Sequence, residues 1–368
     1  MSKINLALIH GGRSGEHEVS LVSAAYVLRS LAPEKYNVHP VRIDHDGRWF
    51  KVSLDAAKAA ADQGSLPKTG GSPCALVNRG AGPVLEVRGD ADEDIALDFA
   101  FPMLHGTFGE DGRMQGLFEA LNLPFAGSGT AGSAMAMDKI AARRICAALD
   151  IPQPDFRELS KTEFAAAGPT RMSEIASALN FPLFVKPANL GSSVGVSKAV
   201  NLDELQRALE EAFKFDHRAI IEVGMDVREL EVGVLGNTEA SLSTIGEVIV
   251  HANFYSYDAK YENEQDYDVQ VPADIPANIE KQMRETAVQA YHALNCAGFA
   301  RADFFYVEDE NRLYFNEINT IPGCTPISMF PRLWKHAGVD GPELMDRIVE
   351  FGLERHRRDG ALTYNFSK

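Results

Sequence analysis

The segment that most constrains the fold lies near the C-terminus and reads FARADFFYVEDENRLYFNEINTIPG, from Phe299 to Gly323. Its β-branched and aromatic residues predict two strands, Phe299–Val307 and Arg312–Ile318, joined by a polar turn over Glu308–Asn311. We expect the rest of the chain to converge on this segment.

Charged side chains in this hairpin are expected to lie beside large apolar ones. Side chains alternate across a strand. This alternation predicts two mixed faces: Arg301, Asp303 and Phe305 on the first strand, and Leu313, Phe315, Glu317 and Asn319 on the second. An ionised carboxylate among apolar groups is costly unless a positive charge accompanies it. Arg301 can neutralise one of the two carboxylates, but not both.

A Mg²⁺ ion held by Asp303, Glu317 and Asn319 would resolve this mismatch, because hard cations take carboxylate and amide oxygens and share the rest with nucleotide phosphates. The turn that follows, residues 319–323, has backbone donors that could face an anion. The alternative is an exposed hairpin whose polar face only meets water. The segment thus favours a nucleotide site, provided that other parts of the chain supply groups for the phosphates.

Length and charge exclude several classes of protein. A chain of 368 residues predicts two or three domains. Its formal net charge of −16 argues against nucleic acid or an anionic membrane as the main partner. No apolar run approaches the roughly 20 residues of a membrane span, and the start is too short for a signal peptide. The cysteines show neither paired spacing nor CxxC, so we expect a reduced, cytoplasmic protein: Cys74, Cys146, Cys296 and Cys324.

The N-terminus predicts an open α/β sheet. A buried strand over Ile4–Ile9 is followed by a glycine-rich turn and an amphipathic helix that runs to Leu31. The turn does not spell GxGxxG, and Glu16 and Glu18 would repel a pyrophosphate at the helix start. We therefore expect a ligand with a positive group, such as an amino-acid ammonium. The alternative for Glu16 is a carboxylate that only caps the helix.

A second glycine-rich turn is expected at the same edge of this sheet. Strands are predicted at Asn37–Ile43, Trp49–Val52 and Ile95–Leu104, and the last of them ends at His105. Ligands of open α/β sheets bind at the carboxyl ends of strands, so His105 should lie in the same crevice as Glu16. A structural role for this single histidine is the alternative.

The middle of the chain carries a glycine and serine run between apolar segments. A helix is predicted over Thr130–Leu149, with Asp138 and Lys139 within it, and a strand over Phe181–Val185. The strand leads into residues 186–196, whose backbone N–H groups could surround phosphate oxygens while Lys186 supplies a charge. No GK[ST] follows, so this is not a Walker loop, and an ordinary hairpin turn is the alternative.

Beyond this run, alternating patterns predict antiparallel strands: Ala219–Val223, Arg228–Leu235 and Leu242–Val250. Residues 224–226 fall where a hinge between lobes would lie, and an adenine could enter there with Glu229 reaching the ribose. Asn253–Pro272 has no periodicity and is too long for an ordinary connection, which is typical of a lid. A helix is predicted over Asp274–Leu294.

Seven motifs in this order resemble the D-alanine–D-alanine ligase family of ATP-grasp enzymes: HGGRSGEHEVSL, LHGTFGEDGRMQG, AMDK, VKPANLGSSVGV, YDAKY, RADFF and NEINTIPG. Each motif alone is weak, but the set is specific and runs from about Asn5 to about Lys335. The resemblance implies an N-terminal open α/β domain followed by two ATP-grasp lobes that hold ATP between antiparallel sheets. It also implies residues 1–139, 140–225 and 226–368 as the three units, with a lid at 253–272.

The resemblance assigns roles to individual positions. Nucleotide binding falls to Lys139, Lys186, Ser193, Glu222 and Glu229, with the two lysines on the phosphates, Glu222 at the adenine hinge and Glu229 at the ribose. Metal binding falls to Asp303, Glu317 and Asn319, with Glu317 bridging two Mg²⁺ ions that Mn²⁺ could replace. Substrate contacts fall to Glu16, His105, Lys260 and Ser328. Stabilisation of a tetrahedral intermediate falls to Arg301 and the Gly323 N–H, and a hydrogen-bonded trio joins Glu16, Ser192 and Tyr261.

The implied reaction joins two D-alanines at the expense of ATP, through a D-alanyl phosphate, for peptidoglycan precursor synthesis. A homodimer without nucleic-acid or membrane partners is the expected assembly. Within the class, a D-alanine–D-lactate ligase is the alternative. Outside it, a catalytically silent binding module and a dinucleotide oxidoreductase remain; the intact Arg301, Glu317 and Asn319 set disfavours the first, and the N-terminal turn disfavours the second. The D configuration of the substrate rests on the resemblance alone.

Overall fold

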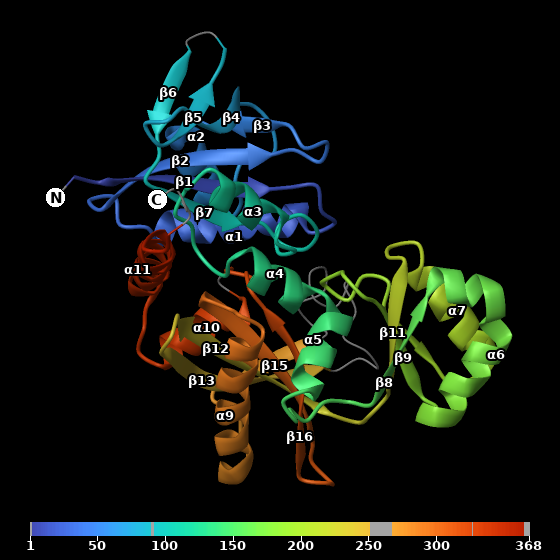
Figure 1. The fold of residues 1–368 in the computed structure, drawn as a ribbon. Helices are drawn as coiled ribbons and strands as arrows, with labels where there is room; N and C mark the ends of the chain where they lie inside the picture. Colours follow the sequence, from blue (N-terminus) through green and yellow to red (C-terminus); the bar gives the residue numbers. More distant parts are fainter. Residues whose placement is uncertain (1, 90–91, 251–266, 326, 364–368) are drawn as a thin grey trace.

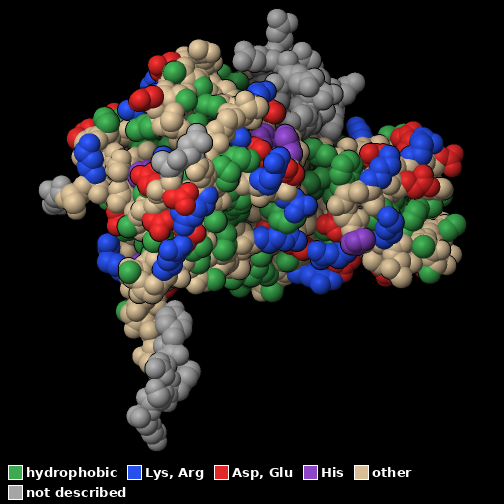
Figure 2. Space-filling view, turned by 90° about the horizontal axis from the view of Figure 1, so that it is seen from above, with side chains coloured by type: hydrophobic (Ala, Val, Ile, Leu, Met, Phe, Trp, Pro, Cys, Tyr) green, Lys and Arg blue, Asp and Glu red, His purple; other side chains and the backbone are tan. Residues whose placement is uncertain are grey.

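The protein was analysed as a computed structural model that describes residues 2–89, 92–250, 267–325 and 327–363. Three bodies of secondary structure surround a central region, and the first two meet the third from different sides (Figure 1). Acidic and basic side chains are interspersed over the face seen in Figure 2, so the net charge is not gathered there into one acidic area. In the part of the chain that is described, helices are too short or too polar to cross a membrane.

The first body is a mixed sheet around a buried N-terminal strand. Within the described residues its strand order is β6-β5-β4-β3-β2-β1-β7, and β1 pairs in parallel with β2 and β7. Leu6, Ala7, Leu8 and Ile9 of β1 are fully buried, which explains why this strand is central. The strands are β1 (Ile4–Gly11), β2 (Tyr36–Ile43), β3 (Trp49–Lys51), β4 (Ser72–Asn78), β5 (Pro83–Val87), β6 (Glu93–Ala96) and β7 (Phe99–Met103).

One strand prediction in this body was wrong. The segment predicted as a single strand over Ile95–Leu104 contains β6 and β7, which lie at opposite ends of the strand order. Only Leu97 and Asp98 connect β6 to β7, and two residues reach only a short distance. The two edge strands of the sheet must therefore come close together. Asp98 accepts a hydrogen bond of 2.8 Å from the backbone N–H of Asn5, which holds the break against β1.

Helices from both ends of the sequence cover this sheet. The helices near in sequence are α1 (His17–Ser30), α2 (Leu54–Ala61) and α3 (Arg113–Ala120), and the C-terminal α11 (Gly341–Gly360) lies beside them (Figure 1). α11 contributes Leu344, Met345 and Ile348 to the core that α1 and β7 share. The N- and C-terminal parts of the chain are thus packed into one core, which the sequence patterns did not predict.

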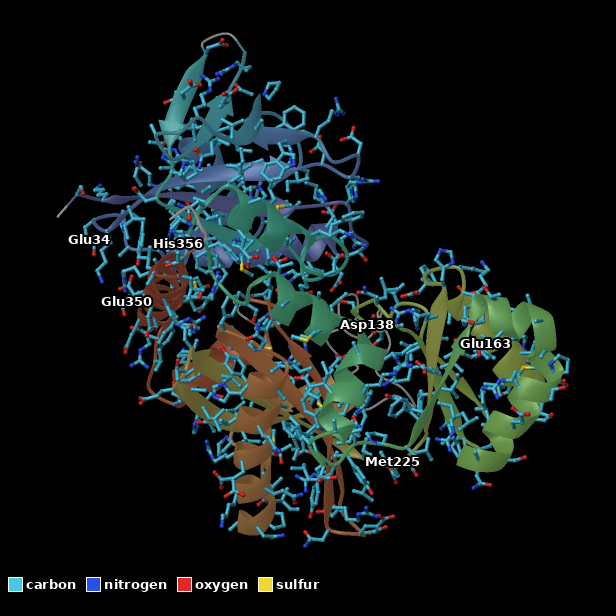
Figure 3. The ribbon with its side chains drawn as sticks, viewed as in Figure 1. Glu34, Asp138, Glu163, Met225, Glu350 and His356 are labelled. Atoms are coloured by element: carbon cyan, nitrogen blue, oxygen red, sulfur yellow. The ribbon has the colours of Figure 1, made fainter. Side chains whose placement is uncertain are left out.

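The helix predicted over Thr130–Leu149 is two helices, α4 (Thr130–Met137) and α5 (Lys139–Ala147). Asp138 separates them in an extended conformation, and its side chain accepts a hydrogen bond from the Ala141 N–H as the N-cap of α5. Figure 3 labels Asp138 at this break, where the chain passes from the first body toward the others. The break puts Lys139 at the start of a helix.

The second body is a small antiparallel sheet covered by two helices. Its strand order is β10-β9-β11-β8 among the described residues, with strands β8 (Phe156–Ser160), β9 (Leu183–Pro187), β10 (Ser197–Ala199) and β11 (Arg218–Val223). α6 (Lys161–Leu179) begins at Lys161, because Ser160 and Glu163 form a capping box there. α7 (Leu202–Ala212) packs beside it. Met225, labelled in Figure 3, lies in the connection to the third body.

The third body is an antiparallel sheet, as predicted. Its order in the described residues is β14-β13-β12-β15-β16, with strands β12 (Arg228–Gly236), β13 (Ala240–Val250), β14 (Tyr267–Gln270), β15 (Gly298–Val307) and β16 (Arg312–Asn319). Its helices are α9 (Ala277–Ala293) and α10 (Met329–His336). The end of the predicted lid forms β14, whereas Lys260, Tyr261 and the other residues at 251–266 lie outside the described residues.

The hairpin of β15 and β16 forms as predicted, but one of its faces differs from the prediction. Asp303 pairs with Glu317 and the next residue, Phe304, pairs with Phe315, so Asn316 is the extra residue of a bulge. The bulge turns Leu313 and Phe315 into the core with Phe304, while Glu317 and Asn319 face the cavity with Asp303. The prediction assumed strict alternation of side chains along β16, which would place Leu313, Phe315, Glu317 and Asn319 on one face.

Candidate active site

A cavity of about 730 Å³ lies where the first and third bodies meet the glycine-rich loop of the second. Most of the site residues predicted from the sequence line it: Glu16, His105, Lys139, Ser192, Glu229, Arg301, Asp303, Glu317, Asn319, Gly323 and Ser328. Lys186, Ser193 and Glu222 are not in its lining, and Lys260 and Tyr261 lie outside the described residues. Residues as far apart as 16 and 328 are therefore brought to one cavity by the fold.

Arg301 is the centre of a charged network on the cavity face of the sheet. Its Nε and a terminal nitrogen donate to the two oxygens of Asp303, each at 2.7 Å, and its Nε lies 2.9 Å from Glu231 Oε2. Burial alone would lower the pKa of the guanidinium, but Asp303 and Glu231 outweigh it and raise the pKa well above its ordinary value. The arginine stays charged beside the cavity.

The residues predicted to bind metal form a set of oxygen donors. Asn319 Nδ2 donates to Asp303 Oδ2 at 2.8 Å, and Asp303 and Glu317 are directly paired across β15 and β16. Lys139 Nζ lies 3.1 Å from Glu317 Oε2. Two carboxylates and an amide oxygen suit Mg²⁺ or Mn²⁺, which prefer oxygen ligands. The donor set therefore fits the predicted ions.

Glu222 lies behind the cavity and is fully engaged by two cations. Arg143 donates to its Oε1 at 2.9 and 2.5 Å, and Lys186 Nζ lies 2.6 Å from its Oε2. Burial raises the pKa of this carboxyl, but Arg143 and Lys186 overcome that effect and lower it to about 2. Lys186 is also 5.8 Å from the ring centre of Phe305, a cavity residue. Glu222 thus orients Lys186 beside the cavity.

Glu16 connects the first body to the glycine-rich loop. It is the N-cap residue of α1, but its side chain makes no capping hydrogen bond to the helix. Ser192 Oγ donates to Glu16 Oε1 instead. Ser192 and Ser193 both have positive φ, 51° and 58°, a conformation that turns the loop tightly toward Glu16. Two members of the predicted trio are in contact.

His105 and Glu110 are buried in the wall between the first and third bodies. His105 Nδ1 lies 3.0 Å from the Ile321 carbonyl oxygen and Nε2 lies 2.9 Å from Ser23 Oγ. Burial lowers the pKa of His105 to about 4, so the imidazole is neutral. Burial, followed by the charge of Glu16, raises the pKa of Glu110 to about 8. Both side chains make structural contacts at the edge of the cavity.

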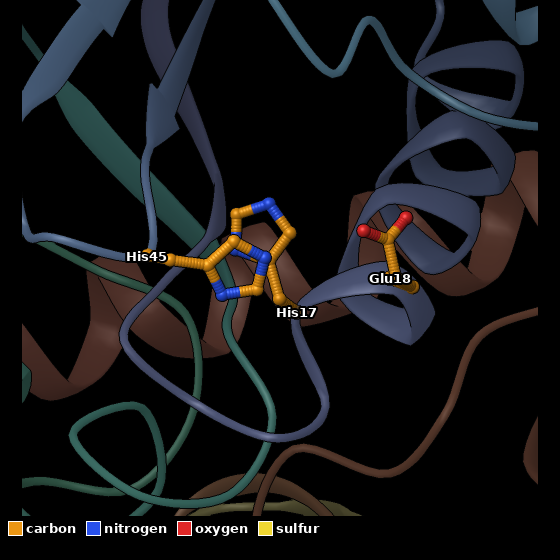
Figure 4. Close-up of side chains that lie close together, drawn as sticks. All are labelled: His17, Glu18 and His45. Atoms are coloured by element: carbon orange, nitrogen blue, oxygen red, sulfur yellow. The ribbon is translucent and has the colours of Figure 1, made fainter.

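A second group of possible metal ligands is formed by His17, Glu18 and His45 (Figure 4), of which Glu18 also lines the cavity. The two imidazoles are stacked with ring centres 3.9 Å apart and planes 23° apart. A ring nitrogen binds a metal with a lone pair in the plane of its ring, so stacked rings do not aim at one ion. Glu18 is paired with Lys68 at 2.6 Å. This group is better described as a stacked pair beside a surface ion pair.

The sequence patterns missed four residues that shape the site: Ser23, Glu110, Arg143 and Glu231. Two of them carried a usable signal. Glu231 follows Glu229 by two residues on a strand and so shares its face. Arg143 follows Lys139 by four residues on a helix. Ser23 and Glu110 act through contacts with the distant residues 321–324, which no local pattern reveals.

Comparisons with known proteins agree along the whole chain. The model described as D-ala D-ala ligase N-terminus matches residues 5–128, and the one described as D-ala D-ala ligase C-terminus matches residues 145–350. A D-alanine–D-alanine ligase of Bacillus pumilus is 40% identical over 367 residues, which is 99% of this chain and 100% of the relative. D-alanine–D-alanine ligase A of Chromobacterium violaceum is 42% identical over 365 residues, 99% of both chains.

Solved structures are similar over nearly the same length. The D-alanine–D-alanine ligase of Coxiella burnetii has a TM-score of 0.82 at 32% identity and covers 98% of this chain and 97% of its own. The VanG D-Ala:D-Ser ligase of Enterococcus faecalis has a TM-score of 0.81 at 32% identity, over 95% of this chain and 100% of its own. With these full-length matches and the mixed and antiparallel sheets described above, the chain belongs to the D-alanine–D-alanine ligase family.

Proposed function

We propose that this protein joins two molecules of D-alanine to D-alanyl-D-alanine, with conversion of ATP to ADP and phosphate, and so supplies a peptidoglycan precursor. The observation that carries the proposal is the convergence of residues from six separate motifs on one cavity, in a chain that is similar to D-alanine–D-alanine ligases over its full length. A carboxylate is a poor electrophile. Transfer of the ATP γ-phosphoryl group to the first D-alanine makes it an acyl phosphate.

Binding of the nucleotide is assigned to cations and carboxylates of α5 and of the second and third bodies. Lys139 and Lys186 would bind the phosphates, Glu229 the ribose, and Ser193 and the hinge near Glu222 the rest of the nucleotide. Asp303, Glu317 and Asn319 would hold two Mg²⁺ ions, which neutralise phosphate charge when bound. The geometry that supports this is the 3.1 Å contact between Lys139 and Glu317, which brings a phosphate-binding cation beside a metal ligand.

The second half-reaction forms the amide. The neutral amine of the second D-alanine attacks the acyl carbon and the carbonyl oxygen gains negative charge. Phosphate leaves as the carbonyl re-forms, and it takes up the proton that the nitrogen loses. Arg301 and the Gly323 N–H are assigned to that oxygen, and each such donor typically lowers the barrier by about 3 kcal/mol. His105, Lys260 and Ser328 would bind the substrates, and the trio of Glu16, Ser192 and Tyr261 would hold the lid closed against water.

We further propose the division into residues 1–139, 140–225 and 226–368, a homodimer as the assembly, and the cytoplasm as the compartment. The four free cysteines suit a reducing compartment. An acyl phosphate must also be kept from water, which supports a lid role for 253–272.

A coupled assay of ADP release tests the function. We expect release with D-alanine alone, product identified as D-alanyl-D-alanine, and none with L-alanine. A panel with D-serine and D-lactate as second substrates separates the alternatives, because one similar structure is a D-Ala:D-Ser ligase. ADP release that needs D-lactate would replace the dipeptide assignment. Binding of the substrates without any ADP release would point to a silent binding module.

A further inference from the structure

The backbone of the third body beside Gly323 is fixed by side chains of the first body. Ser23 accepts a hydrogen bond of 3.3 Å from the Cys324 N–H, and His105 Nδ1 lies 3.0 Å from the Ile321 carbonyl oxygen. Glu110 Oε1 accepts one of 3.2 Å from the Ile321 N–H. We call Ser23, His105 and Glu110 the loop anchor. Gly323 lies between its two points of attachment.

The hydrogen bonds of the anchor can be oriented from chemistry. The His105 imidazole is neutral because burial lowers its pKa to about 4. Its Nδ1 faces a carbonyl oxygen, so Nδ1 carries the hydrogen and Nε2 accepts from the Ser23 hydroxyl at 2.9 Å. The Ser23 oxygen then accepts from the Cys324 N–H. The hydrogen bonds thus run from the Cys324 N–H through Ser23 and His105 to the Ile321 carbonyl oxygen, and the backbone of residues 321–324 closes the ring.

Glu110 extends this ring into the glycine-rich turn of the first body. Its Oε2 accepts a hydrogen bond of 2.7 Å from the Gly106 N–H, while Oε1 accepts from Ile321. Each oxygen therefore accepts one hydrogen bond from a backbone N–H. Ser23 is fully buried and Glu110 nearly so, which means that water does not replace these contacts when one is removed.

We propose that Ser23 and Glu110 are positioning residues that hold the Gly323 N–H in place for amide formation. This inference rests on the proposed function, in which that N–H stabilises the tetrahedral intermediate. A donor stabilises the oxyanion only when it lies about 2.7–3.1 Å from the position that the oxyanion will occupy. Displacement by about 1 Å can cost about 100-fold in rate. The first body thus contributes to the second half-reaction without touching the reacting atoms.

The proposal predicts that the loop anchor affects amide formation but not formation of the acyl phosphate. Formation of the acyl phosphate depends on the lysines and metal ligands, whereas the hydrogen bonds of the anchor go to backbone groups of Gly106, Ile321 and Cys324. Loss of the anchor should slow attack by the amine, so that acyl phosphate leaves the site and is hydrolysed to D-alanine and phosphate. More ADP would then be produced than dipeptide. A general loss of structure would instead lower both products together.

The experiment measures ADP and D-alanyl-D-alanine in the same reaction for the wild type, Ser23→Ala and Glu110→Gln. The glutamine keeps the side-chain volume, but its amide nitrogen cannot accept a hydrogen bond. Ser20→Ala is the matched control, because Ser20 is an equally buried serine of α1 whose hydroxyl bonds Gly11 and Met103 within the first body. Affinity for a non-hydrolysable ATP analogue and thermal unfolding are measured alongside.

We expect equal ADP and dipeptide in the wild type and in Ser20→Ala. In the two anchor variants dipeptide formation should fall about tenfold or more, the ratio of ADP to dipeptide should rise, and nucleotide affinity should stay near that of the wild type. A ratio of ADP to dipeptide that remains at the wild-type value in Glu110→Gln overturns the proposal. If Ser23→Ala does not fold, Glu110→Gln alone provides the test. Absence of D-alanine-dependent ADP release in the wild type would instead contradict the proposed function.

Discussion

The ammonium group of Lys139 lies 3.1 Å from a carboxylate oxygen of Glu317. The lysine begins α5 and the glutamate is near the end of β16, so the contact joins two elements that are distant in sequence. The same ammonium donates to the Leu190 carbonyl oxygen at 2.9 Å, in the glycine-rich loop. One side chain therefore connects the helix, the predicted metal site and the loop expected to cover the phosphates.

Replacing Glu317 with glutamine keeps the shape of the side chain and removes its charge. If Glu317 bridges two metal ions, kcat should fall about 100-fold or more, because metal coordination stabilises the reaction by several kcal/mol. The fold should survive, since this side chain lies at the cavity rather than in the core. The measurement is D-alanine-dependent ADP release together with circular dichroism. Near-normal turnover in Glu317→Gln would refute the metal assignment.

Replacing Lys139 with alanine should act on the nucleotide. A hydrogen bond to a charged group typically contributes about 1.5–3 kcal/mol, which corresponds to about tenfold or more in affinity. We therefore expect the KM for ATP to rise by at least that factor, while the KM for D-alanine changes little. Lys161→Ala is a control, because Lys161 bonds a backbone oxygen of the second body away from the cavity. Equal increases in both KM values would argue against a phosphate role.

The buried pair of Arg143 and Glu222 should make stability depend on pH. The pKa of Glu222 is about 2 in the folded protein, below the 4.5 of an unperturbed carboxyl. The native state therefore binds fewer protons than the unfolded state between these values, and the stabilisation is present above pH 4.5 and lost as pH falls toward 2. Glu222→Gln should lower the free energy of unfolding by about 3 kcal/mol at pH 7.

Urea unfolding at pH 7 and at pH 3 provides the measurement, and the difference between wild type and variant should shrink at the lower pH. Glu158→Gln is the matched control, because Glu158 pairs with the neighbouring Arg144 at the surface. Exposed pairs contribute about 0–1 kcal/mol, so this variant should differ little from the wild type at either pH. A Glu222→Gln effect of equal size at both pH values would contradict the assigned charge state.

Tyr261 is predicted to determine which nucleophile the second subsite accepts. Its phenol would bond Ser192 and Glu16, which are in contact with each other in the structure. Removing a buried hydrogen bond costs about 1–3 kcal/mol, enough to change a product ratio about tenfold. Tyr261→Phe should therefore gain D-alanyl-D-lactate relative to D-alanyl-D-alanine. Competition between D-alanine and D-lactate for one acyl phosphate pool tests this, and an unchanged ratio would leave Tyr261 as a packing residue only.

The sequence alone predicted many of the local elements and most of the residues that line the cavity. The strands β1, β2, β12, β15 and β16 were predicted within a few residues, because their apolar patterns and turns are local signals. Strand alternation placed Asp303 on the same face as Arg301. Two carboxylates with only one arginine beside them predicted a metal cation there. Motif order indicated the family, which the comparisons then confirmed.

Only the tertiary structure decided which distant residues meet. The bulge at Asn316 depends on how β16 pairs with β15, and it alone separates Phe315 from Glu317. Ser23 meets Cys324 although 301 residues separate them. Such contacts arise from packing of whole bodies against one another, and a local sequence pattern carries no information about a partner that the fold brings from elsewhere.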